Sequence, residues 1–299
     1  MEEPRIPEAS PAPPASPKRS LWAAFFLALV VAALNVGLWA FINRPVDLPN
    51  WEGKVEGFAF SAFQRYQSPL RNNYPTDDEL AADLRIIAQY GKRVRTYSSL
   101  ESAAIPRLAR DLGLSVMAGA WLDRRMEHNE LELEAAISAA ARWPNVDRVM
   151  VGNETMLRDD LKIGQMIDYL DRARAAIRQP VSTAEPFHIW KKYPELVEHV
   201  DFITVHLLPY WEGIPRKDAI GFALGNYREL QRLYPGKKVV IGEIGWPSYG
   251  DRKKFAEPTI ADEAHFIRDW LNVAREQNLD YYLMEAFDQP WKEEAEGRA

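Results

Sequence analysis

Apolar residues beyond position 53 follow two alternating patterns along the chain. Short runs rich in β-branched residues, such as Val239, Val240 and Ile241, predict strands buried on both faces, as in a parallel sheet. Longer stretches between them predict helices. The helix expected at residues 76–90 has acidic residues in its first turn, where they favour the positive end of the helix dipole. The pattern therefore indicates repeated strand–helix units.

Eight such strands can be counted, at residues 57–60, 93–97, 115–121, 146–154, 181–184, 201–206, 238–243 and 280–287. Helices are expected between them at residues 76–90, 101–112, 130–142, 161–178, 221–233 and 260–277. This number and order match a (β/α)8 TIM barrel, which typically takes about 250 residues. A doubly wound sheet is the alternative. It would more often have a glycine-rich phosphate turn after its first strand, and residues 57–61 (Gly-Phe-Ala-Phe-Ser) are not one.

The segment Leu21–Ile42 is apolar for 22 residues, long enough to cross a bilayer as a helix. Its only strongly polar member is Asn35, and Lys18 and Arg19 precede it. A cleaved signal peptide is the alternative. However, the run exceeds a typical signal-peptide core, and no small-x-small cleavage pattern follows at residues 41–45. We predict an uncleaved single-pass anchor with a cytoplasmic N-terminus and the remaining chain outside.

The segments around this anchor give the domain organisation. Residues 1–20 hold six prolines among alanine and serine, which predicts a disordered tail. Residues 43–52 are interpreted as a linker, and residues 53–299 as one catalytic barrel. After the eighth strand, residues 292–299 are too short and polar to form a covering helix. We therefore expect a barrel without its last helix, an exposed apolar seam between strands eight and one, and a chain that continues in a longer polypeptide or is truncated.

Composition excludes several function classes. A net charge of −6 argues against nucleic-acid binding, which normally needs a basic face. The absence of cysteine excludes disulfides and thiolate metal sites, and the five histidines lack metal-ligand spacing. The sequence contains neither a nucleophile elbow nor a complete phosphate loop. We expect no metal and no cofactor.

Two predicted strands end in a glutamate, Glu154 after strand four and Glu243 after strand seven. The working face of a TIM barrel is built from the C-terminal ends of its strands, so both carboxylates should face one cleft. Paired carboxylates are the machinery of glycosidic-bond cleavage: one donates a proton to the leaving oxygen, and the other attacks the anomeric carbon. A separation of roughly 5 to 5.5 Å would give retention of configuration.

Four motifs stand in order along the chain at predicted strand ends: residues 94–97 (Val-Arg-Thr-Tyr), 151–154 (Val-Gly-Asn-Glu), 242–247 (Gly-Glu-Ile-Gly-Trp-Pro) and 285–292 (Glu-Ala-Phe-Asp-Gln-Pro-Trp-Lys). Together they resemble glycoside hydrolase family 17, the family of plant, fungal and bacterial β-1,3-glucanases and related transglycosylases. The last motif looks most like the bacterial and fungal branches. Two positions depart from the family pattern: Gln289 stands where a third glutamate is frequent, and Leu208 where an aromatic residue is frequent.

The resemblance implies a role for each matching residue. It implies Glu154 as acid/base, Glu243 as nucleophile and Asn153 as the ligand of the sugar 2-hydroxyl. It also implies that Tyr97 lies beside the catalytic pair and that Tyr210 approaches the nucleophile from strand six.

Other residues near strand ends have two readings each. Trp246, Trp211, Trp291 and Trp121 could stack on pyranose rings or cap the core, and for Trp246 we favour sugar contact. His206 is either an orienting group or a hydrogen-bonded core residue. Lys292 either binds a sugar hydroxyl or neutralises nearby acids, and we interpret Glu285 as a buried structural acid.

These observations predict a membrane-anchored retaining enzyme that acts on β-1,3-glucan in the manner of an endo-β-1,3-glucanase. On the bacterial resemblance, it would lie in the inner membrane with its barrel in the periplasm. One alternative is a transglycosylase or branching domain that works with a membrane glucan synthase. Another is a non-catalytic glucan-binding module, which would be expected to lack one carboxylate.

Overall fold

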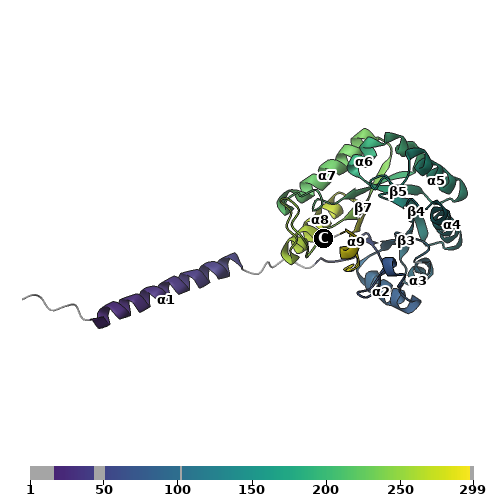
Figure 1. The fold of residues 1–299 in the computed structure, drawn as a ribbon. Coiled ribbons are helices and arrows are strands. Elements are labelled where there is room, and N and C mark those ends of the chain that lie inside the picture. Colours follow the sequence, from purple (N-terminus) through teal and green to yellow (C-terminus); the bar gives the residue numbers. More distant parts are fainter. Residues whose placement is uncertain (1–16, 44–50, 102, 297–299) are drawn as a thin grey trace, which may run out of the picture. The chain divides into compact units, whose positions relative to one another are not determined.

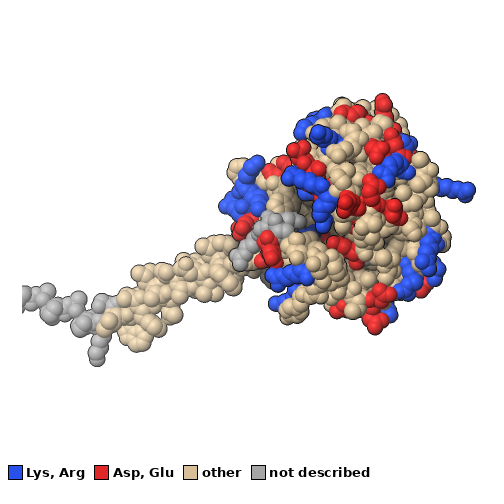
Figure 2. Space-filling view, turned by 45° about the vertical axis from the view of Figure 1, so that its right-hand side comes forward, with Lys and Arg blue, Asp and Glu red and all other residues tan. Residues whose placement is uncertain are grey.

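The computed structural model describes residues 17–43, 51–101 and 103–296, without the side chains of residues 17–20, 295 and 296. It divides into two compact units, residues 1–47 and 48–299. The first contains one helix, α1 (Pro17–Ile42), which includes the whole predicted span Leu21–Ile42. Figure 2 shows residues 21–42 of this helix without charged side chains, whereas acidic and basic residues mix over the visible face of the barrel. The predictions for residues 1–16 and 44–50 lie outside the described residues.

The second unit is a closed eight-stranded parallel barrel with helices outside it (Figure 1), as predicted. Its strands are β1 (Phe58–Ala59), β2 (Arg93–Arg95), β3 (Ser115–Ala120), β4 (Val146–Asn153), β5 (Val181–Pro186), β6 (Phe202–Leu207), β7 (Lys238–Ile244) and β8 (Tyr281–Leu283). Pairing of Phe58 with Leu283 closes the barrel. Neighbouring strands follow chain order throughout, so the C-terminal ends of all eight strands meet at one face.

The helices of this unit are α2 (Asp77–Tyr90), α3 (Ile105–Asp111), α4 (Met126–Arg142), α5 (Ile163–Ala176), α6 (Phe187–Lys192), α7 (Arg216–Leu233), α8 (Ile260–Glu276) and α9 (Lys292–Glu296). Short 3-10 helices lie at η1 (Pro69–Arg71) and η2 (Pro194–His199). Thr76 and Glu79 form a capping box that fixes the start of α2 where its acidic first turn predicted it. The sequence did not predict α6 and η2, because neither is long enough to show a helical period.

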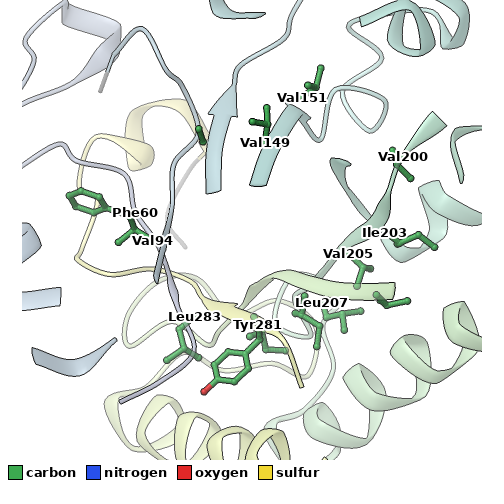
Figure 3. Packing of buried hydrophobic residues seen from close by; sticks show 14 of the residues in the cluster. Phe60, Val94, Val149, Val151, Val200, Ile203, Val205, Leu207, Tyr281 and Leu283 are labelled. Carbon is green, nitrogen blue, oxygen red and sulfur yellow. The ribbon is translucent and has the colours of Figure 1, made fainter. Parts of the chain in front are cut away.

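Apolar burial separates into an outer shell and a small interior cluster. The outer shell lies between the strands and helices, and Figure 3 shows some of its members, including Val149 and Val151 of β4 and Leu283 of β8. The interior cluster consists of Met117, Met150, Ala184, Phe202, Val240 and Tyr282. Four of these residues, Met117, Met150, Val240 and Tyr282, have outer-shell residues on both sides along their strands. Toward the C-terminal face, the inward-pointing residues become polar, which positions chemistry there.

The expected exposed seam beside β8 is wrong for the described residues. All three residues of β8 are buried. Trp270 of α8 packs edge-to-face on Tyr281 with ring centres 5.7 Å apart, and Trp51 and Val55 join the same apolar cluster. The strand is short enough for α8 and the segment before β1 to cover its outer residues.

Candidate active site

Glu154, His206 and Glu243 meet at the C-terminal face of the barrel, brought there by β4, β6 and β7. The sheet register pairs His206 directly with Glu243. His206 Nδ1 lies 2.7 Å from Glu154 Oε1 and 3.4 Å from Glu243 Oε2. One oxygen from each glutamate and one histidine nitrogen lie within 4.8 Å of one another. The two predicted carboxylates therefore lie together, with a histidine between them.

The backbone around Glu154 is bent to aim its side chain. Gly152 has φ 82° and Glu154 has φ 53°, a left-handed conformation that non-glycine residues adopt at a cost. A Cβ atom on Gly152 would meet Thr155 Oγ1 at 2.8 Å, so this position requires glycine. The Glu154 N–H donates to Ala184 O at 2.7 Å, which holds the bend against β5.

Arg95, which is fully buried, connects the second carboxylate to Asn153. Its Nη1 donates to Glu243 Oε1 at 2.6 Å, and its Nη2 donates to Asn153 Oδ1. Because a guanidinium can only donate, the amide oxygen of Asn153 must face Arg95 and its NH2 group turns away. Burial raises the pKa of Glu243, but the positive charges of His206, Arg95 and Lys292 outweigh burial and lower this pKa to about 2.

The two glutamates differ in exposure. The side chain of Glu154 is 25% exposed, whereas that of Glu243 is 5% exposed. Glu243 is therefore a shielded carboxylate held ionised by fixed cations. Glu154 is reachable from solvent and contacts the histidine.

The ring of Tyr97 lies close to both Arg95 and Lys292. The Arg95 guanidinium carbon is 4.8 Å from the centre of the Tyr97 ring, and Lys292 Nζ is 5.5 Å from it. Burial, together with the charges of Glu243 and Glu285, raises the pKa of Tyr97 well above its usual range. Lys292 Nζ donates to Glu285 Oε2 at 2.6 Å, and the Ser61 N–H donates to Glu285 Oε1 at 2.9 Å. Burial raises the pKa of Glu285 despite Lys292.

A cleft of about 460 Å³ lies between the segments that follow β6, β7 and β8, and Glu285 and Lys292 are among the residues that line it. Trp211 lines it and is 39% exposed. Trp246 also lines it but is only 3% exposed: it packs between Tyr210 and Phe266 and donates its indole N–H to Glu257 O. The Tyr210 hydroxyl donates to Asp251 O. Of these three predicted ligands, only Trp211 presents a large ring surface to solvent.

The remaining tryptophans lie in side-chain contacts of their own. Trp291 packs on Phe63 and donates its indole N–H to Gln289 Oε1 at 2.7 Å. The Arg158 guanidinium carbon lies 4.4 Å from the centre of the Trp121 ring. These contacts fix the orientation of both rings.

Glu154, His206 and Glu243 also have the spacing of metal ligands. In the structure their facing atoms are held by one another and by Arg95. That no metal takes part stays a prediction.

Comparison with known proteins identifies the barrel. Residues 57–299 match the model of the BtgE/BtgC glycoside hydrolase domain. The chain belongs to this family. The resemblance to glycoside hydrolase family 17 is also confirmed by a solved structure, the family 17 β-1,3-glucanosyltransferase from Rhizomucor miehei, with TM-score 0.69 and 27% identity over 79% of this chain and 88% of that one.

Relatives in this family carry glucanase names. A probable glucan endo-1,3-β-glucosidase of Aspergillus flavus is 27% identical over 259 residues, which are 76% of this chain and 37% of that protein. A glucan 1,3-β-glucosidase of Schizosaccharomyces pombe is 27% identical over 238 residues, 73% of this chain and 74% of that protein. The chain thus spans little more than a third of the Aspergillus relative. An active-site mutant of the Rhizomucor enzyme has been solved with laminaritriose.

The sequence predicts the full role of neither Arg95 nor His206. Arg95 belongs to one of the four motifs, and a charge inside a buried strand is itself a sign of a polar interior, but the motif does not show its partners. For His206, the sequence is compatible with either an orienting role or core packing. Its position at the end of β6, next in register to Glu243, is the information that the sequence alone lacks.

Proposed function

We propose that the barrel cleaves β-1,3-glucan with retention of configuration, using Glu243 as nucleophile and Glu154 as acid/base. The observation that carries this proposal is the shared contact of both carboxylates with His206 at the C-terminal face, with oxygens within 4.8 Å. This proximity suits a double displacement, because an inverting pair must leave room for a water molecule between the carboxyl group and the sugar.

The two environments assign the two roles. A nucleophile must be ionised, and the buried Glu243 has a pKa near 2 because His206 and Arg95 outweigh its burial. An acid/base must exchange protons with the leaving group and the incoming acceptor, which suits the more exposed Glu154. The NH2 group of Asn153, turned away from Arg95, is proposed to donate to the sugar 2-hydroxyl.

In the first step, a Glu243 oxygen attacks the anomeric carbon while the glycosidic C–O bond breaks and Glu154 gives its proton to the leaving oxygen. In the second step, Glu154 takes a proton from the acceptor hydroxyl as the acceptor oxygen attacks the anomeric carbon and Glu243 leaves as a carboxylate. Water as acceptor gives hydrolysis, and a sugar hydroxyl gives transfer. Tyr97 and Lys292 border the nucleophile and are proposed to contact the sugar bound there.

The substrate class rests on relatives named for β-1,3-glucan, and it is supported by a cleft between the segments that follow β6, β7 and β8. Trp211 offers a ring on which a pyranose can stack. Trp246, Tyr210 and Trp291 are proposed to shape the cleft rather than to stack on sugar, because hydrogen bonds and packing hold each of them. A non-catalytic glucan-binding module is disfavoured, because both carboxylates are present and in contact with one histidine.

For the N-terminal unit, we propose that Leu21–Ile42 is an uncleaved anchor in the cytoplasmic membrane, that residues 43–52 are a linker, and that the barrel works on the outer side of the membrane. The support is a helix long and apolar enough to span a bilayer. A bacterial location with a periplasmic barrel, and a neighbouring membrane glucan synthase as partner, extend this proposal. Carbonate extraction of membranes tests it: release of the protein, or an N-terminus found after residue 42, would contradict the anchor.

The decisive experiment is product analysis on laminari-oligosaccharides with the wild type and Glu154→Ala. The wild type should release β-configured products, shorter by hydrolysis or partly longer by transfer. Adding azide to Glu154→Ala should restore turnover of a substrate with a good leaving group and yield a β-glycosyl azide, since azide then attacks the Glu243-linked intermediate. An α-glycosyl azide would mean that the two roles are exchanged, and an inert wild type would overturn the proposal.

A further inference from the structure

A buried acid, Glu185, accepts hydrogen bonds from the backbone of the turn that follows Glu154. This residue lies near the end of β5, between the strands that carry Glu154 and His206, and it is fully buried. Its Oε1 accepts from the Met156 N–H at 2.7 Å, and its Oε2 accepts from the Leu157 N–H at 3.2 Å. Both carboxylate oxygens are thus used on the backbone within three residues of Glu154.

Arg158, which lies in the same turn, forms a second set of hydrogen bonds that fixes its backbone. The guanidinium donates to Asn153 O and, at 3.0 Å, to Leu122 O, while its Nε donates to Asp160 Oδ2 at 2.7 Å. With the Glu154 N–H on Ala184 O, the backbone around the left-handed Glu154 is fixed at several points. A strained conformation persists only where its surroundings determine it in this way.

A buried acid at this position has no packing explanation. Burial raises the pKa of Glu185 and the charge of Glu154 raises it further, whereas the Met156 and Leu157 N–H groups lower it because they hydrogen-bond to the ionised carboxylate. A carboxyl group is costly to bury unless it satisfies partners. Here the partners are two N–H groups that the bend of the backbone leaves without helical or sheet acceptors.

We propose that Glu185 is a positioning residue for the proton transfer by Glu154: by fixing the Met156 and Leu157 N–H groups, it keeps the Glu154 carboxyl aimed at the leaving oxygen. This inference rests on the proposed role of Glu154 as acid/base. Glu185 itself, being fully buried, touches no substrate.

Two substrates separate positioning from general stability. Laminaritriose has a sugar leaving group that needs a proton from Glu154, whereas 2,4-dinitrophenyl β-laminaribioside has a leaving group that needs none. In Glu185→Gln, one accepting oxygen becomes an NH2 group, which cannot accept from the backbone N–H that it faces. In Glu185→Met, the side chain is of similar length but accepts from neither the Met156 nor the Leu157 N–H. We expect kcat/KM on laminaritriose to fall about tenfold in Glu185→Gln and further in Glu185→Met, while the rate constant for dinitrophenol release changes less than twofold.

Glu132 provides the matched control. It is equally buried and also accepts from a backbone N–H, that of Ser99 at 3.0 Å, but on the loop after β2. Glu132→Gln should change kcat/KM on laminaritriose and the rate constant for dinitrophenol release by the same factor. Equal loss on both substrates in the Glu185 variants, or no loss on either, would overturn the positioning role, and Glu185→Gln alone suffices if Glu185→Met does not fold.

Glu154→Gln, assayed in parallel, distinguishes failure of this inference from failure of the proposed function. If Glu154→Gln loses laminaritriose cleavage but keeps dinitrophenol release while the Glu185 variants show no such selectivity, only the positioning role is wrong. If Glu154→Gln loses both activities equally, the acid/base assignment is wrong and the positioning role falls with it.

Discussion

Each end of the barrel holds a carboxylate against arginine, but the two ends balance charge in different ways. At the N-terminal end, Asp280 lies 3.0 Å from Arg93, 2.8 Å from Arg148 and 2.5 Å from Lys238, so three cations surround this acid, and Arg93 also pairs with Glu56. At the C-terminal end, Glu243 shares His206 with Glu154, so two acids meet around one histidine.

The two carboxylates differ in whether both of their oxygens are paired with cations from arginine or lysine. Both oxygens of Asp280 form ion pairs, Oδ1 with Arg93 and Oδ2 with Arg148, as expected for a group with a structural role at the N-terminal end of the barrel. Glu243 Oε1 is held by Arg95, while Oε2 faces His206 and the neighbouring Glu154. We therefore expect the ion pairs of Asp280 to serve the stability of the fold, and the ion pair of Glu243 to serve its proposed role as nucleophile. Variants at the two ends should separate activity from stability.

The largest expected effect is at the C-terminal end. Glu243→Gln removes the nucleophile, so kcat on laminari-oligosaccharides should fall by about 10⁴-fold or more. The barrel should still fold, because the amide keeps the shape of the carboxyl group, but it should be less stable than the wild type, because the ion pair with the buried Arg95 is lost. Initial-rate assays with circular dichroism as a folding control measure both quantities. Residual activity within tenfold of the wild type would remove Glu243 from the nucleophile role.

Asp280→Asn should show the reverse pattern. It leaves Arg148 and Lys238 without this carboxylate and Arg93 with Glu56 alone, and breaking a largely buried ion pair costs roughly 3 kcal/mol or more of unfolding free energy. Denaturant unfolding of the barrel measures this loss. kcat/KM of the folded fraction should stay within about twofold of the wild type, and a larger change would mean that the two ends are coupled.

Acid sharpens the same comparison. Burial raises the pKa of Asp280, but Arg148, Arg93 and Lys238 lower it to about 2, below its ordinary 3.8. A depressed pKa stabilises the fold above the unfolded value, so this contribution of about 2 kcal/mol should be lost as pH falls from about 4 to about 2. The wild-type advantage over Asp280→Asn should shrink across that window, and a constant difference down to pH 2 would contradict the depressed pKa. Glu243 titrates in the same range but cancels between the two proteins.

How far the sequence predicts this molecule depends on the range of the interactions involved. The eight strands and the Glu154–Glu243 pair could be predicted from local patterns, because a buried strand and its end can be recognised from a few consecutive residues. The roles of Arg95 and His206 depend on sheet register across strands far apart in sequence, and a bulge between Val205 and His206 sets that register. The hidden ring of Trp246 depends on packing against Phe266 of α8, which no motif encodes.

The smallest expected effect concerns Trp211 and Trp246, which both follow strand ends and are both predicted from the sequence to contact sugar. Trp211 exposes its ring in the cleft, with Lys253 Nζ 4.8 Å from the ring centre, so Trp211→Ala should raise KM for laminari-oligosaccharides about fivefold, or about 1 kcal/mol, without lowering Tm. Trp246→Ala should instead lower Tm, because removing a buried ring leaves a cavity. KM and melting curves for both variants test this division. A loss of stability in Trp211→Ala with unchanged KM would show that its ring serves the fold, and that the sugar is bound elsewhere along the cleft.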